Sequence, residues 1–215
     1  MVKLYSYFRS SASYRVRIAL NLKGLAYEYL PVHLLRDGGQ QHSPTYRGVA
    51  PEGLVPVLVD DEVTVHQSLA IIEYLDETHP TPPLLPADAA GRAAVRAMAL
   101  DIACDIHPLG NTRVLKYLAA NFGLQKEGTD AWIVHWVSTG FDAFETRLAR
   151  SSERDGFCYG NAPTLADVML VPQVFNARRF GVDMSRYPLI AAVDARCAQI
   201  PAFADAAPAG QVDAE

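Results

Sequence analysis

The sequence predicts an α/β domain at the N-terminus followed by an all-α domain. Three observations lead to this fold class. Strand-like and helix-like segments alternate over residues 2–78, four prolines fall within the eight residues HPTPPLLP, and strand-like segments are absent after them. Such alternation is typical of α/β domains, and closely spaced prolines exclude regular secondary structure, so they mark a boundary.

The first predicted elements are a strand, a helix and a second strand. The β-rich segment VKLYS covers residues 2–6, a helical segment covers 11–23 and stops at Gly24, and the strand-like YEYLPVHL covers 27–34. These three segments form a βαβ unit.

A β-hairpin and a further helix come next. Two β-rich runs in VPVLVDDEVTVH flank the pair Asp60–Asp61, which predicts a turn between them. The segment QSLAIIEYLDETH at 67–79 has its apolar residues at helical spacing. The order βαβ followed by ββα is that of a thioredoxin-like sheet.

The proline-rich stretch sets the predicted domain boundaries. Residues 1–80 are expected to form the α/β domain, 81–87 a linker, and 88–215 the all-helical domain. Within the last of these, apolar residues recur every three or four positions, first at Val95, Met98, Ile102 and Ile106 and again within 132–148 and 165–177. The C-terminal stretch AAPAGQVDAE is expected to fray.

Composition narrows the classes of function. The net charge is −5 and the basic residues are scattered, which argues against nucleic-acid and membrane-surface partners. The start MVKLYSYFRS lacks a secretory signal and no apolar run reaches the length of a membrane span, so a cytoplasmic location is expected. Cys104, Cys158 and Cys197 are far apart and the six histidines show no ligand spacing, so neither disulfides nor a metal site is expected.

Two helix starts in the first domain have residues suited to an anion. Ser10 or Ser11 precedes the first predicted helix, where a serine can cap the helix and also donate a hydrogen bond to an anion. Gln67 and Ser68 open another helix, where the Ser68 N–H and hydroxyl can hold a carboxylate. Capping alone is the commoner role for the serine before the first helix, and the second helix start is equally consistent with a simple cap. Together with the strand edge beginning at Pro56, they would form a cleft suited to a small peptide-like anion.

The second domain offers weaker functional signals. Thr164 and Asp167 are spaced as a capping box, which is interpreted as a folding signal alone. Asp101 and Asp105, one helical turn apart beside His107 and Arg113, are interpreted mainly as solvated helix charges.

A pair of arginines follows the apolar segment LVPQVF. Arg178 and Arg179 are more often a salt-bridged helix end, but an arginine near a cleft is also the natural bidentate partner of a substrate carboxylate. Both alternatives remain open from the pattern alone.

Three stretches together carry a family resemblance: SYFRSSASYRVRIALNLKG, VPVLVDDEVTVHQSLAIIEYLDETHPTPPLLP and TLADVMLVPQVFNARRFGVDMSRYPLI. They closely resemble the zeta class of glutathione S-transferases, the family of maleylacetoacetate and maleylpyruvate isomerases, and the likeness runs nearly from end to end. The zeta signature Ser-Ser-Cys-Ser-x-Arg-Val-Arg is matched from Ser10 to Arg17, except that Ala12 replaces the cysteine.

The resemblance implies the glutathione transferase fold, glutathione as cofactor, a small dicarboxylic keto acid as substrate, and a homodimer. It implies that Ser10 bonds the glutathione thiolate with support from Ser11, which we expect mainly to cap the helix. The residues implied to contact glutathione are Ser10, Ser11, Gln41, Val55, Pro56, Gln67 and Ser68, with Val55 preceding a cis Pro56. The residues implied to bind substrate are Arg9, His107, Arg113 and Arg179, with Arg9 and Arg179 also catalytic.

The chemistry that the resemblance implies is reversible addition of the thiolate to the cis double bond of a maleyl keto acid. Rotation about the resulting single bond and elimination give the fumaryl product and return glutathione. Ala12 is compatible with this reaction because the nucleophilic sulfur comes from glutathione. Ala50 and Glu52 depart from the family's usual turn, which puts one contact with glutathione in doubt.

Two other functions are consistent with the same residues. One is glutathione conjugation or dehalogenation of small α-haloacids, and the other is a non-catalytic interaction module with the glutathione transferase fold. Consumption of glutathione would distinguish the first from isomerisation, and failure to bind glutathione would favour the second.

Overall fold

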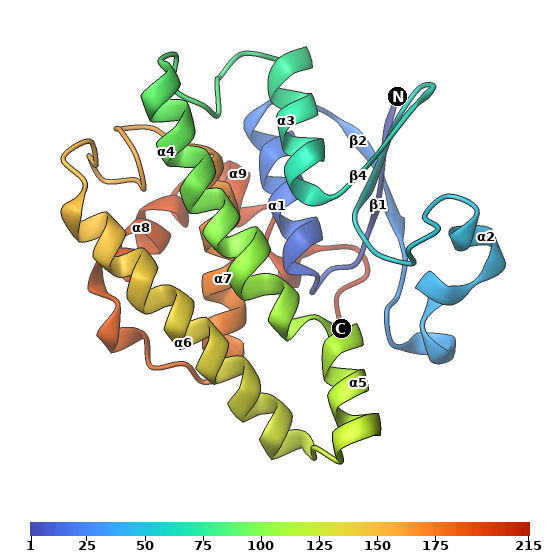
Figure 1. The fold of residues 1–215 in the computed structure, drawn as a ribbon. Coiled ribbons are helices and arrows are strands. Elements are labelled where there is room, and N and C mark those ends of the chain that lie inside the picture. The colour runs from blue at the N-terminus through green and yellow to red at the C-terminus, as the bar shows by residue number, and fades with distance from the viewer. The chain divides into compact units, whose positions relative to one another are not determined.

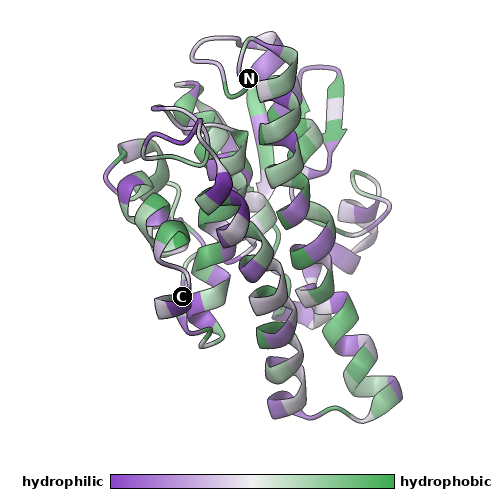
Figure 2. Ribbon diagram, turned by 60° about the vertical axis from the view of Figure 1, so that its left-hand side comes forward, coloured by the Kyte–Doolittle hydropathy of each residue, from purple (hydrophilic) through white to green (hydrophobic).

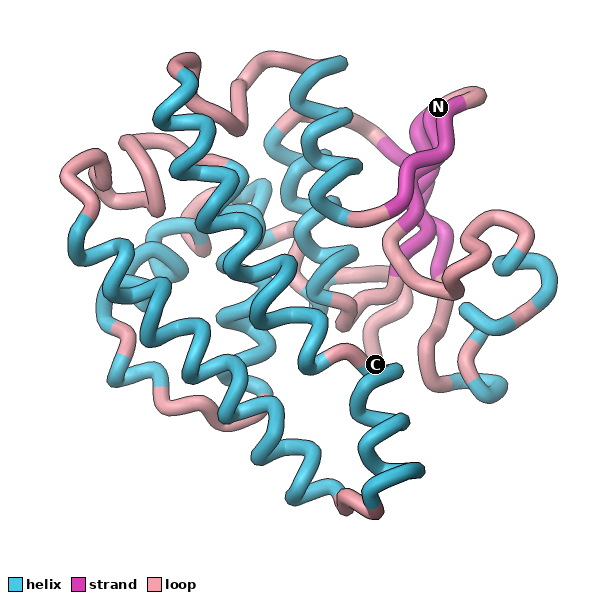
Figure 3. Tube along the Cα trace, viewed as in Figure 1, coloured by secondary structure: helices cyan, strands magenta, loops and turns pink.

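The computed structural model describes residues 1–215, which fold into two compact units. The first unit comprises Met1–Leu84 together with Ala198–Glu215, and the second comprises Leu85–Cys197. All strands belong to the first unit, as Figure 3 shows in magenta, and the second unit is helical. The predicted combination of an α/β domain and an all-helical domain is confirmed.

A four-stranded mixed sheet forms the centre of the first unit. Its strands are β1 (Val2–Ser6), β2 (Tyr27–Pro31), β3 (Val57–Asp60) and β4 (Val63–His66), in the spatial order β2-β1-β3-β4. β1 runs parallel to β2 and antiparallel to β3, and β3 pairs antiparallel with β4 across the predicted Asp60–Asp61 turn. The order βαβ followed by ββα therefore matches the prediction.

Helices cover both faces of this sheet. α1 (Ser11–Leu22) and α3 (Ser68–Thr78) pack together on one face, and the short α2 (Pro44–Arg47) lies on the other, as Figure 1 shows. The alternation of side chains along the strands explains the division, because successive residues point to opposite faces. Val57 belongs to the core cluster that contains Tyr46 of α2, and its neighbour Leu58 is fully buried.

The C-terminal segment corrects two predictions. Residues 198–215, which include α9 (Pro201–Ala204), belong to the first unit, so the helical domain ends before them and not at residue 215. The tail is also held, where fraying was expected. Asp213 accepts hydrogen bonds from the Phe8 N–H at 3.1 Å and the Tyr29 hydroxyl at 2.6 Å. These bonds join the C-terminal segment to residues near the N-terminus. The local composition of the C-terminal segment therefore did not indicate them.

The proline-rich stretch has no helix or strand, and the unit boundary falls within it, after Leu84. Its first part is tied to the first unit. The Lys23 ammonium donates to the Asp76 carboxylate at 2.6 Å and to the Pro82 carbonyl at 2.5 Å, and Asp76 also accepts the Leu84 N–H at 2.8 Å. This network explains why residues up to Leu84 belong with the sheet.

The helices of the second unit are α4 (Ala89–Leu100), α5 (Thr112–Phe122), α6 (Lys126–Arg150), α7 (Leu165–Arg179) and α8 (Pro188–Cys197). Figure 2 shows apolar and polar residues interspersed along them, as the predicted helical periodicity requires. α7 begins with the predicted capping box, in which Asp167 accepts the N–H and hydroxyl of Thr164, each at 2.8 Å. None of the helices combines the length and apolar character needed to cross a membrane.

One segment departs from the predicted α-helical spacing. Residues Asp101–Ile106 (η3) form a π-helical segment that continues α4, and His107–Gly110 (η4) follow as a 3-10 turn. The interpretation of Asp101 and Asp105 as solvated charges is therefore incomplete, because Asp101 pairs with Arg147 of α6 at 3.0 Å.

Candidate active site

Three chain segments meet at one edge of the sheet because of the strand register. Tyr5 of β1 pairs with Val57 of β3, and Val57 pairs with His66 of β4. The carboxyl ends of β1 and β4 therefore lie beside the amino end of β3. The start of α1 comes soon after β1, Pro56 comes just before β3, and the start of α3 comes just after β4. The strand register therefore brings together the residues that are predicted to form a cleft.

The start of α1 is capped by Ser10. The Ser10 hydroxyl oxygen accepts the Ser13 N–H at 3.2 Å, and Ser10 has the extended backbone of an N-cap residue. Our prediction that Ser11 mainly caps this helix is wrong, because Ser11 is already the first helical residue. An N-cap residue precedes the helix, and its side-chain oxygen accepts an N–H of the first turn, as Ser10 does here. Ser11 and Ala12 beside it are both buried.

The start of α3 has no side-chain cap. Gln67 has a φ of 69°, and no side chain caps the helix that begins at Ser68. The first N–H groups of a helix lack partners within the helix and lie at the positive end of its dipole. Ser68 is buried, and its hydroxyl accepts a hydrogen bond from the Arg15 guanidinium at 3.2 Å.

Pro56 lies just before β3, whereas Gln41 lies in the short helical turn Gln40–His42 (η2) of the first unit. The Val55–Pro56 peptide is cis, as the resemblance implied, and directly precedes β3. Gln41 is buried, and its amide donates to the Leu34 carbonyl at 3.3 Å, while its side-chain oxygen has no hydrogen-bond partner in the protein. Gly39 makes room for this side chain, since a Cβ there would lie 2.7 Å from the amide nitrogen.

Glu52 has a partner in this structure. Its carboxylate lies 2.9 Å from Nδ1 of His66, the last residue of β4. The departure of Glu52 from the family's usual turn is thus accompanied by a hydrogen-bonding partner at the end of β4. Sequence reasoning did not pair the two because they are far apart along the chain.

The residues assigned to a substrate lie in different units. Arg9 belongs to the first unit, is half-buried, donates to the Tyr7 hydroxyl at 3.0 Å and stacks over the rings of Tyr7 and Phe8. His107, Arg113 and Arg179 belong to the second unit. Within it, Arg113 is the second residue of α5 and Arg179, stacked on Phe180, is the last of α7.

The two neighbouring arginines of α7 have different contacts. Arg178 donates to Asp194 of α8 at 2.6 Å and is a salt-bridged helix end. Burial raises the pKa of Asp194, although the Arg178 bond opposes this rise. Arg179 lies over the ring of Phe180, and its role in carboxylate binding stays a prediction.

Sequence reasoning missed two arginines of the motif. Arg15 and Arg17 lie on α1 and are 2% and 0% exposed, which the helical pattern alone did not indicate for charged residues. Arg17 donates to the carbonyls of Phe8 at 3.0 Å and Ala206 at 2.9 Å, so it ties the loop before α1 to the C-terminal segment. The two Arg positions in the signature were the available signal.

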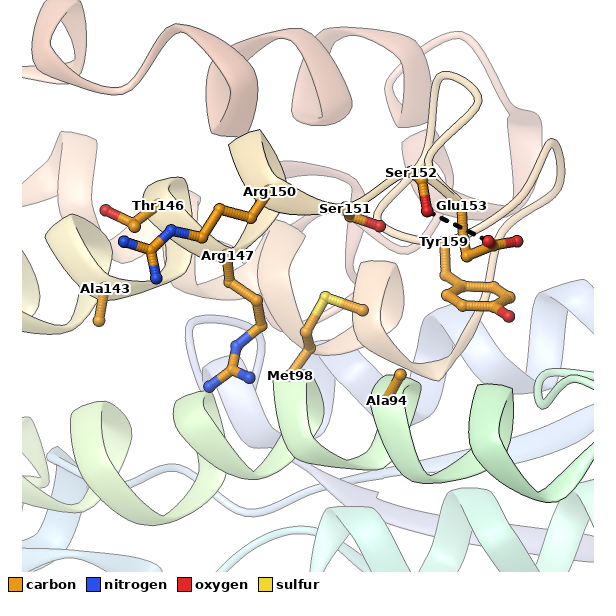
Figure 4. A pocket seen from close by; sticks show the side chains of 10 residues that line it. All are labelled: Ala94, Met98, Ala143, Thr146, Arg147, Arg150, Ser151, Ser152, Glu153 and Tyr159. Carbon is orange, nitrogen blue, oxygen red and sulfur yellow. Dashed lines mark hydrogen bonds between the residues drawn. The ribbon is translucent and has the colours of Figure 1, made fainter.

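A separate cavity of about 650 Å³ lies within the second unit (Figure 4). Residues of α4 and α6, among them Met98, Arg147 and Arg150, line it together with Tyr159. None of the predicted site residues lines this cavity. It is therefore distinct from the edge of the sheet at which the starts of α1 and α3 meet.

Comparison with known proteins identifies relatives along the whole chain. Residues 4–83 match the family described as "Glutathione S-transferase, N-terminal domain", and residues 137–196 match "Glutathione S-transferase, C-terminal domain". A probable maleylacetoacetate isomerase of Vibrio cholerae is 53% identical over 211 residues, covering 98% of this chain and 97% of the relative.

Two solved structures are also similar. The holo structure of a bacterial zeta-class maleylpyruvate isomerase has a TM-score of 0.97 and 51% identity, covering 99% of this chain and 100% of the other. A maleylacetoacetate isomerase from Methylobacterium extorquens, with bound malonate and glutathione, has a TM-score of 0.95 and 39% identity, covering 99% of both chains.

Proposed function

This chain belongs to the zeta class of glutathione S-transferases, and on that premise we propose that it is a glutathione-dependent cis-trans isomerase of maleyl keto acids. The substrate is maleylacetoacetate or maleylpyruvate, and the product is the corresponding fumaryl keto acid. The observation that carries the proposal is the gathering of Ser10, Pro56 and Ser68 at one sheet edge, in a chain about half identical to isomerases of both kinds.

The residues at this edge fit glutathione. Ser68 at the uncapped start of α3 suits the carboxylate of the γ-glutamyl end, and Gln67 precedes it. Val55 is proposed to pair with the peptide backbone of glutathione, as the family resemblance implies, and the unpartnered oxygen of Gln41 is a buried acceptor. When bound, glutathione supplies the thiolate that adds reversibly to the double bond of the substrate.

Ser10 has the hydrogen-bonding capacity to hold that sulfur as a thiolate. Its oxygen accepts the Ser13 N–H, and its hydroxyl hydrogen therefore remains available as a donor. A free thiol has a pKa of about 8.5, and a helix N-terminus lowers the pKa of a thiol placed against it. Ser10 thus supplies a donor at the point where negative charge must be held, with Ser11 and the first N–H groups of α1 beside it.

Arginines are proposed to hold the two carboxylates of the substrate. Arg9 is preoriented by the Tyr7 hydroxyl and by two aromatic rings, which reduces the side-chain freedom lost on binding. Arg179 is proposed as the second anchor, and Arg113 and His107 as further contacts. Fixed cations at these positions would also stabilise the charge that spreads toward the ketone in the transition state.

Two further proposals concern the setting of the enzyme. We place it in the cytoplasm, the compartment that its three unpaired cysteines favour, and we assign it a homodimer on the family resemblance. Cell fractionation and sedimentation of the purified chain test these two statements independently of activity.

A comparison of substrates tests the proposed function. We expect kcat/KM for maleylacetoacetate or maleylpyruvate, followed as appearance of the trans product, to exceed kcat/KM for halide release from an α-haloacid. Omission of glutathione should abolish the isomerisation. Faster halide release than isomerisation would make the chain a dehalogenating transferase, and a chain that does not bind immobilised glutathione would be a non-catalytic module.

A further inference from the structure

Arg15 is a buried cation that the protein itself leaves largely unpaired. The residue is 2% exposed, and one guanidinium nitrogen donates to the Ser68 hydroxyl at 3.2 Å. Its Nε and its second terminal nitrogen have no hydrogen-bond partner in the protein. Burial lowers the pKa of Arg15 to about 9, with no nearby carboxylate among the causes that would oppose this.

Arg17, one position beyond Val16 on the same helix, shows what a structural arginine looks like in this fold. It donates to the Ser6 hydroxyl and to the carbonyls of Tyr7, Phe8 and Ala206 at 2.9–3.4 Å. Its Nε and both terminal nitrogens are engaged. The contrast shows that the fold can satisfy a buried arginine fully, and that it does not do so for Arg15.

Arg15 is not expected to stabilise the folded protein. A buried charge is costly unless it is paired, and unpartnered buried N–H groups add their own desolvation cost. Replacing poorly compensated buried charges with apolar side chains of similar volume is often neutral or stabilising. An anion that arrives with the ligand would offset this cost, whereas nothing in the unliganded chain does.

The bond from Arg15 determines what Ser68 can do. The serine oxygen accepts the guanidinium N–H, so its hydroxyl hydrogen must point elsewhere and is available as a donor. Ser68 opens α3, where no side chain occupies the exposed N–H groups. A carboxylate at that position would meet the Ser68 hydroxyl, the helix start and the positive field of Arg15 together.

We propose that Arg15 is a positioning residue for glutathione, which acts through the Ser68 hydroxyl to hold the carboxylate of the γ-glutamyl end. This inference rests on the proposed function, since it takes glutathione as the ligand of the edge formed by α1 and α3. Arg15 sets the direction of the Ser68 donor and supplies positive charge behind it. Arg17 has no such role and serves the fold.

Calorimetric titration of two ligands tests the proposal. The first ligand is glutathione, and the second is 4-aminobutanoyl-cysteinylglycine, which lacks only the γ-glutamyl carboxylate. Arg15→Met should raise the Kd of glutathione by about tenfold or more, the size expected for a lost hydrogen bond to a charged group. It should leave the Kd of the analogue within about twofold of wild type. Arg15→Lys keeps the charge and should recover part of the affinity for glutathione only.

Equal loss for both ligands, or no loss for glutathione, would overturn the proposal. Thermal unfolding without ligand supplies a second test. Arg15→Met should keep or raise the wild-type Tm, while Arg17→Met should lower it. A Tm loss in Arg15→Met as large as that in Arg17→Met would make Arg15 structural and overturn the inference.

The Kd measurements and the isomerase assay together show whether the role of Arg15 or the proposed function has failed. A wild-type chain that binds glutathione but does not isomerise a maleyl acid would contradict the function and leave the expected Kd pattern in place. An active wild-type chain with an unchanged Kd in Arg15→Met would contradict the role of Arg15 alone.

Discussion

The hydroxyl oxygen of Ser10 accepts the backbone N–H of Ser13 at 3.2 Å. This bond closes the first turn of α1 and leaves the hydroxyl hydrogen of Ser10, which we propose is donated to the sulfur of glutathione. Sequence reasoning divided these functions between Ser10 and Ser11. The structure gives the cap to Ser10, and two effects of a single substitution follow.

Replacement of Ser10 by alanine is expected to lower both stability and turnover. Loss of the cap should reduce the free energy of unfolding by about 1 kcal/mol. Loss of the donor should reduce kcat by about 10²-fold or more, as for other charge-stabilising donors. Ser43 caps α2 through the same kind of bond, from the Tyr46 N–H at 3.2 Å, and provides the control. Ser43→Ala should match the stability loss and keep kcat near wild type, and a comparable kcat loss in both variants would contradict the role of Ser10.

Replacement of Asp213 by alanine is expected to destabilise the first unit. The Asp213 carboxylate accepts bonds from the Phe8 N–H and the Tyr29 hydroxyl. Burial, followed by the Asp213 bond, raises the pKa of Tyr29. Leaving both donors unpaired should reduce the free energy of unfolding by about 1–3 kcal/mol, measured by urea unfolding. Asp213→Asn, which keeps one acceptor oxygen, should lose less. Wild-type stability in Asp213→Ala would instead support the expectation that the C-terminal stretch frays.

The three cysteines are expected to differ in reactivity. Cys104 is exposed, whereas Cys158 and Cys197 are fully buried, and burial raises the pKa of both buried thiols. A thiol reagent should therefore label one cysteine rapidly in the native protein and all three after unfolding. Mass spectrometry of the labelled peptides identifies the site, and rapid native labelling of Cys158 would contradict the packing around α7.

Removal of Arg179 is expected to impair substrate use more than removal of its neighbour. Arg179→Ala should reduce kcat/KM for either maleyl acid by about tenfold or more, the loss of one charge-assisted bond to a carboxylate. Arg178→Ala removes a helix-end salt bridge to Asp194 and is the matched control, with kcat/KM close to wild type. Arg9→Ala and Arg113→Ala complete the series, with smaller losses than Arg179→Ala. Wild-type efficiency of Arg179→Ala on both acids would show that the carboxylate assignment is wrong.

Much of the first unit could be predicted because its signals are local. The hairpin turn at Asp60–Asp61 and the period of each strand are visible in short windows, and the paired register then brings the starts of α1 and α3 to one edge. Choosing between Ser10 and Ser11 required the position of the helix start to within one residue, which composition does not determine.

Some features escaped prediction because they depend on contacts between residues far apart in the sequence. Others escaped because one sequence pattern is compatible with two local structures. The polar atoms that hold Asp213 lie at the other end of the chain, and its own surroundings are rich in alanine, proline and glycine. Arg15 and Arg17 are the same residue type in one motif, and only the structure distinguishes the unpaired cation from the paired one. The apolar residues Ile102 and Ile106 suit an α-helix as well as the π-helical segment that forms.

We propose that glutathione takes part in the reaction and is returned unchanged, and the number of substrate molecules converted per glutathione tests this most directly. The chain is incubated with maleylpyruvate and one tenth as much glutathione, while nuclear magnetic resonance follows the vinyl protons and a thiol assay follows free glutathione. We predict complete conversion to the trans isomer with no loss of thiol. Conversion that stops when glutathione has been consumed, with a stable conjugate in its place, would contradict the account and show that the enzyme is a conjugating transferase.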